Sequence, residues 1–93
     1  MYNSFDYNYK MNNIKFLTDT ARQGINLLGN NINQQLFDIY RNYVVSTLRI
    51  ISNNTRIDYV NLYYQFLLYN SNLTFYEQVK KTVEFLLELA KNV

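Results

Sequence analysis

Apolar residues recur at steps of three and four along four stretches of the chain, which is the period of an amphipathic helix. The pattern predicts helices over residues 13–28, 32–52, 56–69 and 75–92. The connections between these segments are only a few residues long, which is typical of antiparallel neighbours. The sequence therefore predicts an all-α fold, a small antiparallel helical bundle of about four helices that occupies residues 13–93 as a single domain.

Each predicted helix has one main apolar stripe that we expect to face the core. The stripes of the first two helices are Ile14, Leu17, Ala21, Ile25 and Leu28, and then Ile32, Leu36, Ile39, Tyr40, Tyr43, Thr47, Ile50 and Ile51. Those of the last two are Tyr59, Val60, Tyr63, Phe66 and Leu67, and then Val79, Val83, Leu86, Leu87 and Ala90. The Tyr, Val and Phe side chains of residues 59–69 also favour a strand. Because clean alternation is missing there and a capping motif precedes the segment, we favour a helix.

Glycine and short polar residues mark the predicted helix ends. We expect Gly29 to end the first helix in the left-handed conformation, and Asn30 or Asn31 to cap the second. The segments Thr55–Asp58 and Thr74–Glu77 have the spacing of capping boxes, which predicts that the third and fourth helices begin there.

Residues 1–12 combine polar and aromatic side chains without a helical period. We expect a short N-terminal arm that is ordered only when it docks on a neighbour. The aromatic side chains that would anchor it are Tyr2, Phe5, Tyr7 and Tyr9.

The composition removes several kinds of chemistry. The 93 residues include no Cys, no His and no Pro, and the formal net charge is +2. Without Cys and His there are no disulfides, thiol nucleophiles, imidazole bases or usual zinc ligands. Gly24 and Gly29 have the spacing of the two P-loop glycines, but Asn30 and Asn31 stand where that loop needs Lys and Ser or Thr. We therefore interpret Gly24 as a site of close helix approach, and we expect no enzyme, no metal site and no cofactor.

Asn and Tyr are abundant, whereas residues with GC-rich codons are scarce. This bias predicts an AT-rich gene, as in many viruses, phages and organelle genomes. The N-terminus lacks the basic and apolar regions of a signal peptide, and no window approaches about 18 uninterrupted apolar residues. We therefore expect an intracellular protein, in a host cytoplasm or an organelle, without membrane insertion.

The helices carry more apolar residues than their main stripes use. The surplus residues are Phe16, Leu27, Ile57, Tyr64, Leu68 and Phe85. Four helices of this length cannot fully cover one of their number, so we expect part of this set to form an exposed patch that marks an interaction site. Tyr64, Leu68 and Phe85 are the expected anchors, with Arg41 or Arg49 at a polar rim. The alternative is that the third helix lies at the centre of the core.

The sequence thus predicts a non-enzymatic protein–protein interaction module, a subunit of a larger assembly or an inhibitor bound to one. Its partner would be a second copy or another protein, and we expect no small-molecule substrate. The second hypothesis is a nucleic-acid-binding helical protein that uses Arg41, Arg49 and Arg56, together with Lys80 and Lys81. Because three arginines supply few phosphate contacts, we prefer the protein partner.

Overall fold

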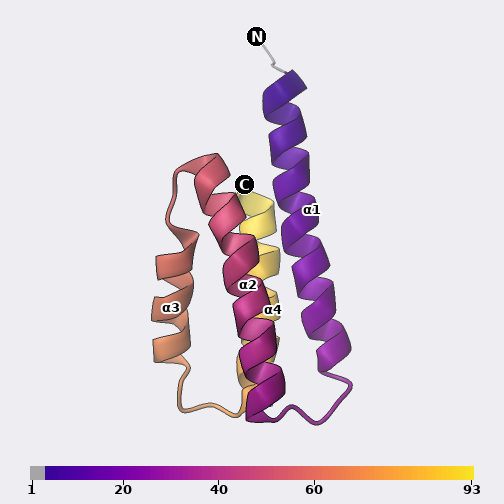
Figure 1. The fold of residues 1–93 in the computed structure, drawn as a ribbon, viewed down its shortest axis with the longest axis vertical. Helices are drawn as coiled ribbons and strands as arrows, with labels where there is room; N and C mark the ends of the chain where they lie inside the picture. Colours follow the sequence, from indigo (N-terminus) through magenta and orange to yellow (C-terminus); the bar gives the residue numbers. More distant parts are fainter. Residues whose placement is uncertain (1–3) are drawn as a thin grey trace.

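The computed structural model describes the backbone of residues 4–93 and the side chains from Asn8 onward. Within residues 4–93 there are four helices and no strand: α1 (Ser4–Leu27), α2 (Gln34–Thr55), α3 (Tyr59–Tyr69) and α4 (Phe75–Asn92). Consecutive helices run in opposite directions (Figure 1). The predicted all-α antiparallel bundle is confirmed, and the alternative of a strand over residues 59–69 is wrong.

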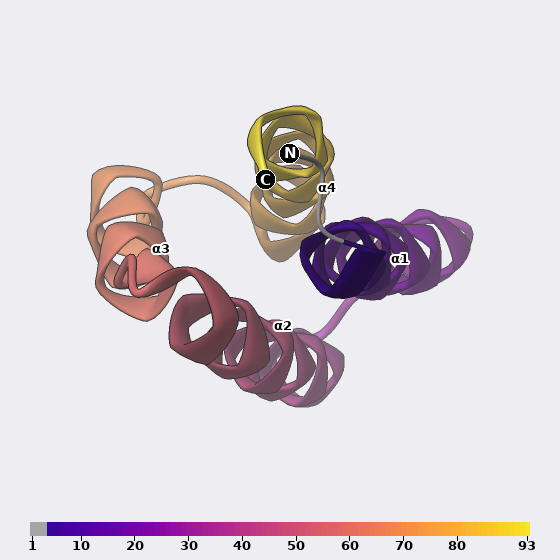
Figure 2. The ribbon, with the colours of Figure 1, turned by 90° about the horizontal axis from the view of Figure 1, so that it is seen from above.

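The helices are arranged so that α1 and α3 lie on opposite sides of the pair formed by α2 and α4 (Figure 2). Of the helix pairs, α1 and α4 pack together most extensively, and α2 packs along both α1 and α3. One long side of α2 therefore faces away from the other three helices (Figure 2).

The N-terminal part of α1 extends past the ends of the other helices (Figure 1). The helix begins at Ser4 rather than near Asn13, so the predicted start is wrong and residues 4–12 form an arm that is itself helical. This segment contains no Gly, Pro or β-branched residue, and extending an existing helix adds one hydrogen bond for each residue fixed. No signal in the segment stops the helix.

The aromatic residues predicted to anchor the arm are described only in part. Tyr9 is 42% exposed on the extended part of α1, and the neighbouring Met11 is 45% exposed. Tyr2 lies outside the described residues, and so do the side chains of Phe5 and Tyr7.

The first turns of α2 and α4 are each capped by the side chain of the residue that precedes the helix. Asn33, rather than Asn30 or Asn31, caps α2, and its side-chain oxygen accepts a 2.9 Å hydrogen bond from a backbone amide of the first turn. Thr74 caps α4 as predicted, because its hydroxyl accepts a 3.1 Å bond from the amide of Glu77. The predicted span of α4 is confirmed at both ends.

The turn between α2 and α3 departs from the prediction. Asp58 caps α3 by accepting a 3.0 Å bond from the amide of Asn61. Thr55 belongs to the end of α2, where its hydroxyl donates to a carbonyl of the preceding turn at 2.8 Å, so its predicted capping role is wrong. Arg56 ends α2 in the left-handed conformation with φ of 61°, whereas Gly29 has no positive φ and does not have its predicted role.

All four helices contribute apolar side chains to one core. The fully or nearly buried ones are Leu17, Ala21, Phe37, Tyr40, Val44, Val45, Leu48, Ile51, Tyr59, Tyr63, Val79, Val83 and Leu86. Most of the predicted stripes of α1, α3 and α4 face this core, but Ile25 and Leu87 are 53% and 40% exposed.

The predicted core face of α2 is rotated relative to the observed one. Ile39, Tyr43 and Ile50 are 59%, 43% and 44% exposed, although the pattern placed them inside. Phe37 and Leu48 face the core in their place. The reason is that α2 carries two apolar stripes, and the helical period alone does not say which one the other helices cover.

Polar contacts between α1 and α2, most of them buried, fix the register of the two helices. The hydroxyls of Thr20 and Thr47 lie 2.9 Å apart, and the amide nitrogen of Asn54 donates to the side-chain oxygen of Asn13 at 2.9 Å. The hydroxyl of Tyr40 donates to the carbonyl of Thr20 at 2.8 Å, and burial raises its pKa well above the ordinary value. These bonds satisfy polar groups that would be costly to bury unpaired.

Gly24 is a site of close helix approach, as predicted. A Cβ atom there would lie 2.6 Å from Cγ2 of Val83 and 2.8 Å from Cζ of Tyr40. Any side chain at this position would push α2 and α4 away from α1.

Candidate functional site

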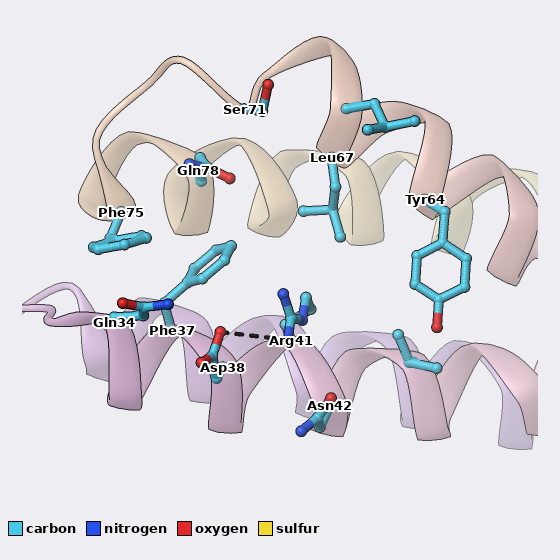
Figure 3. A pocket seen from close by; sticks show the side chains of 12 residues that line it. Gln34, Phe37, Asp38, Arg41, Asn42, Tyr64, Leu67, Ser71, Phe75 and Gln78 are labelled. Carbon is cyan, nitrogen blue, oxygen red and sulfur yellow. Dashed lines mark ion pairs between the residues drawn. The ribbon is translucent and has the colours of Figure 1, made fainter.

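A groove of about 640 Å³ lies between α2, α3 and the connection that leads into α4 (Figure 3). Its lining residues are Gln34, Phe37, Asp38, Arg41, Asn42, Val45, Tyr64, Leu67, Leu68, Ser71, Phe75 and Gln78. The groove combines an apolar wall with a polar mouth, which is typical of sites that bind an apolar group in a fixed orientation.

The apolar wall is built from residues far apart in the chain. The rings of Phe37, in α2, and Phe75, the first residue of α4, stack with centroids 5.1 Å apart and planes inclined by 29°. Leu67 of α3 and Val45 of α2 continue the wall. The wall is anchored because Phe37 and Val45 are each only 6% exposed.

One ion pair lies at the mouth. A terminal guanidinium nitrogen of Arg41 lies 3.3 Å from a carboxylate oxygen of Asp38, one turn earlier on α2 (Figure 3). The guanidinium carbon of Arg41 also lies 5.8 Å from the ring centre of Phe37, within the range of a cation–π contact. Both charged side chains are more than a third exposed, so the pair contributes little to stability and mainly places polar groups beside the wall.

Two large side chains of α3 form the opposite rim. Tyr64 and Leu68 lie one helical turn apart and are 46% and 76% exposed. The Tyr64 side chain extends from α3 toward α2 (Figure 3). The rim thus offers apolar area and a phenol hydroxyl to whatever enters the groove.

The groove brings together part of the residues predicted as a partner-binding set. Arg41, Tyr64 and Leu68 line it. Arg49 and Ile57 lie instead at a smaller hollow of about 400 Å³ beside the connection between α2 and α3. The predicted set is therefore divided between two hollows, with its remaining members elsewhere.

The two predicted residues of α1 line neither hollow. Phe16 is 39% exposed. Leu27 is half-buried and packs against the core, so it is not a free surface residue.

Phe85 of α4 is half-buried and packs against the core next to α3, so it is not an exposed anchor for a partner. Its ring centroid lies 5.6 Å from that of Tyr63 and 5.1 Å from that of Phe66. Beside this cluster, the hydroxyls of Tyr63 and Thr82 lie 3.0 Å apart. Burial raises the pKa of Tyr63 to about 12, against the opposing effects of the Thr82 hydrogen bond and the charge of Arg41.

The alternative of a central third helix is wrong. α3 lies at one side of the bundle (Figure 2). Its outward side chains Leu62, Leu68 and Tyr69 are 45%, 76% and 87% exposed. The apolar character of α3 on all sides thus leaves surface uncovered, as the preferred hypothesis predicts.

Sequence reasoning missed the wall of the groove. Phe37 is not on the predicted stripe of α2, and Phe75 enters the sequence prediction only as the first residue of the last helix. The spacing of Phe37, Asp38 and Arg41 does place a ring, a carboxylate and a guanidinium on neighbouring positions of one helix surface. The stacking of Phe37 on Phe75 has no local signal, because it depends on how α4 returns to α2.

The described residues show no group of three or more acidic side chains placed to hold a metal ion. No helix between residues 4 and 93 is long and apolar enough to span a bilayer. Comparisons with protein-family models, with curated proteins and with solved structures find no match to this chain.

Proposed function

We propose that this chain is a non-enzymatic protein-binding module whose groove between α2 and α3 holds an apolar segment of another protein. The observation that carries the proposal is the exposed pair Tyr64 and Leu68 beside an aromatic wall and a charged mouth. In this role the chain works inside the cell as a subunit of a larger assembly, or as an inhibitor bound to one. An AT-rich viral, phage or organelle gene is the source we propose.

The energetic reason lies in the exposed apolar area. A large apolar side chain left in water forgoes roughly 1.5–3 kcal/mol of burial free energy. Leu68 is 76% exposed and Tyr64 is 46% exposed, although both adjoin a groove that is already apolar. A partner segment that covers both side chains removes this cost and contacts the Phe37–Phe75 wall at the same time.

The lining residues also describe the chemistry of the partner segment. The apolar wall and rim fit two large apolar side chains one turn apart, as on an amphipathic helix. Arg41 has five N–H donors, and its contact with Asp38 uses only part of them. We therefore expect the partner segment to carry a carboxylate next to its apolar pair.

The test is a selection of peptides from a random-sequence display library on the immobilised protein. We expect enriched peptides with two large apolar residues at helical spacing and a nearby Asp or Glu. In Leu68→Asp with Tyr64→Asp, their affinity should fall at least about tenfold, because central anchors typically contribute 2 kcal/mol or more. Binding is measured by fluorescence anisotropy of labelled peptides.

The matched control is Leu62→Asp, on the same helix at 45% exposure and outside the groove. It makes the same kind of change and should leave peptide affinity unchanged, while circular dichroism confirms that every variant stays helical. Equal binding by the double variant, or a selection that enriches no common pattern, would contradict the proposal.

Arg49 and Arg56 lie at the smaller hollow, away from Arg41, and Arg41 is paired with Asp38. This arrangement does not favour the nucleic-acid hypothesis. Binding of random single-stranded or duplex DNA that weakens steeply with salt would nevertheless support it against the protein-binding function.

A further inference from the structure

The uncovered side of α2 carries a second stripe, which is apolar except for one serine. Its members are Leu36, Ile39, Tyr43, Ser46 and Ile50, at alternating steps of three and four residues. This is the heptad spacing of a helix that pairs with another helix. Ile39, Tyr43 and Ile50 are 59%, 43% and 44% exposed, and one long side of α2 faces away from the other described helices (Figure 2).

The stripe continues onto α1. The pairs Thr20–Thr47 and Asn13–Asn54 set α1 and α2 antiparallel with a single register. In that register, residue 16 lies level with residue 51, which places Phe16 beside the Ile50 end of the stripe. Phe16 is 39% exposed, so the apolar face extends across the boundary between the two helices.

The stripe contains no acidic or basic residue. The charged residues Asp38 and Arg41 of α2 lie on its other flank, at the groove next to α3, and Arg49 lies at the smaller hollow. A face without charge fits a partner face that is also uncharged, because burying an unpaired charge is costly. A second copy of this chain offers such a face, because the charged residues that give the chain its net charge of +2 lie outside the stripe.

We infer that the chain forms a symmetric dimer through this face, with α2 of one copy antiparallel to α2 of the other. A two-fold axis between Tyr43 and Ser46 places Ile39 opposite Ile50 of the second copy. It also places Tyr43 opposite Ser46 of the second copy, so a large ring meets a small side chain. The stripe is thus complementary to itself in size under the symmetry that most dimers adopt.

The extent of the face sets the strength of the dimer. Three exposed apolar side chains on α2, with Phe16 beside them, supply a few hundred Å² per copy, below the roughly 800 Å² of a standard interface. We therefore expect a weak dimer with a micromolar dissociation constant. The groove lies on the opposite flank of α2, so each dimer carries two open grooves and can hold two partner segments at once.

The experiment is sedimentation equilibrium from micromolar to millimolar protein, with charge-swap variants. We expect the wild-type chain to dimerise, and Ile39→Lys and Ile50→Glu each to weaken the dimer at least about tenfold while helicity is kept. Mixing the two variants should restore a heterodimer. In the antiparallel arrangement, Lys at position 39 then meets Glu at position 50, and the second end keeps its Ile–Ile contact.

Three results would overturn the inference. If the wild-type chain is monomeric at millimolar concentration, the chain does not form the proposed dimer. If the Ile39→Lys variant dimerises as well as the wild type, the dimer interface is not this face of α2. If the mixed variants fail to associate, the two α2 helices are not antiparallel. In a parallel pair each new charge would face an isoleucine, so mixing would not restore the dimer.

Two controls separate this inference from the proposed groove. Leu62→Lys, at 45% exposure on α3, should dimerise like the wild type. The variant with Tyr64→Asp and Leu68→Asp should also dimerise, and loss of its dimer would place self-association in the groove and contradict the inference. A peptide selection that finds no ligand for the groove leaves all of these dimer results unchanged.

Discussion

The two apolar faces of α2 have similar side chains and opposite surroundings. On the inner face, Val44, Leu48 and Ile51 are fully buried. On the outer face, Ile39 and Ile50 remain about half exposed, although they are as apolar as the residues inside. The comparison teaches that helical periodicity gives the number of apolar faces on a helix, whereas the other helices decide which of them becomes core.

The polar residues of the two faces distinguish them more clearly than the apolar ones. On the inner face, the hydroxyls of Tyr40 and Thr47 bond across to α1 at 2.8 Å and 2.9 Å. On the outer face, the hydroxyl of Ser46 donates to a carbonyl of its own helix at 3.0 Å. The polar residues of the inner face therefore hold α2 against α1 in one register, whereas the Ser46 hydroxyl on the outer face bonds only within α2.

The largest effect that separates the faces is the removal of an apolar side chain. Leu48→Ala should lower the free energy of unfolding by about 2–5 kcal/mol, because it opens a cavity in a fully buried site. Ile50→Ala, two positions later on the outer face, should change it by less than about 1 kcal/mol at concentrations where the chain is monomeric. Urea unfolding at a protein concentration well below the dissociation constant of the proposed dimer measures both. Equal losses would mean that both faces are buried in the monomer.

Alkaline pH gives a second and comparable effect. Burial raises the pKa of Tyr63 from its ordinary value of 10.0 to about 12, since the folded state favours the neutral phenol. This stabilisation is fully present below pH 10 and is lost as the pH rises toward 12. Two pH units at 1.36 kcal/mol each amount to roughly 3 kcal/mol.

Urea unfolding measured across this pH range should therefore show a marked fall in stability, to which the buried Tyr40 adds. Replacement of the phenol in Tyr63→Phe should make that fall shallower, although it also removes the hydrogen bond to Thr82 and lowers stability at neutral pH. A free energy of unfolding that stays constant up to pH 12 would show that water reaches both tyrosines.

The features that the sequence predicts well are those with local causes. Thr74 caps α4 because its hydroxyl needs only the amide of Glu77, three residues away. The fold class follows from the helical period of long segments, and the exposure of Tyr64 and Leu68 follows from the apolar character of α3 on all sides. The first two conclusions need no knowledge of which segments meet in space, whereas the exposure on α3 also depends on the place of that helix at one side of the bundle (Figure 2).

The features that it missed depend on contacts between distant segments. The stacking of Phe37 on Phe75 joins the first turns of α2 and α4, and it forms the wall of the groove. The orientation of α2 follows from the pairing of Thr47 with Thr20 on α1. The early start of α1 at Ser4 has another reason: no residue in that segment stops the helix, and the period alone does not reveal its end.

The smallest expected change in stability comes from removing a single hydroxyl, either that of Thr47 or that of its neighbour Ser46. Thr47→Val keeps the shape of the side chain but removes the bond to Thr20, and should cost about 1 kcal/mol of unfolding free energy. Thr20 still donates to the carbonyl of Phe16 at 2.7 Å, so its own proton stays satisfied and the loss stays small.

Ser46→Ala is the matched change on the outer face. It should alter stability by less than about 0.5 kcal/mol, because Ser46 is exposed and bonds only within its own helix. Because alanine is also small, the position opposite Tyr43 stays open and the proposed dimer should persist. The difference between the two variants, measured by urea unfolding, is the contribution of a cross-helix bond over an intrahelical one. No difference would mean that the bond between Thr20 and Thr47 does not help to hold the register of α1 on α2.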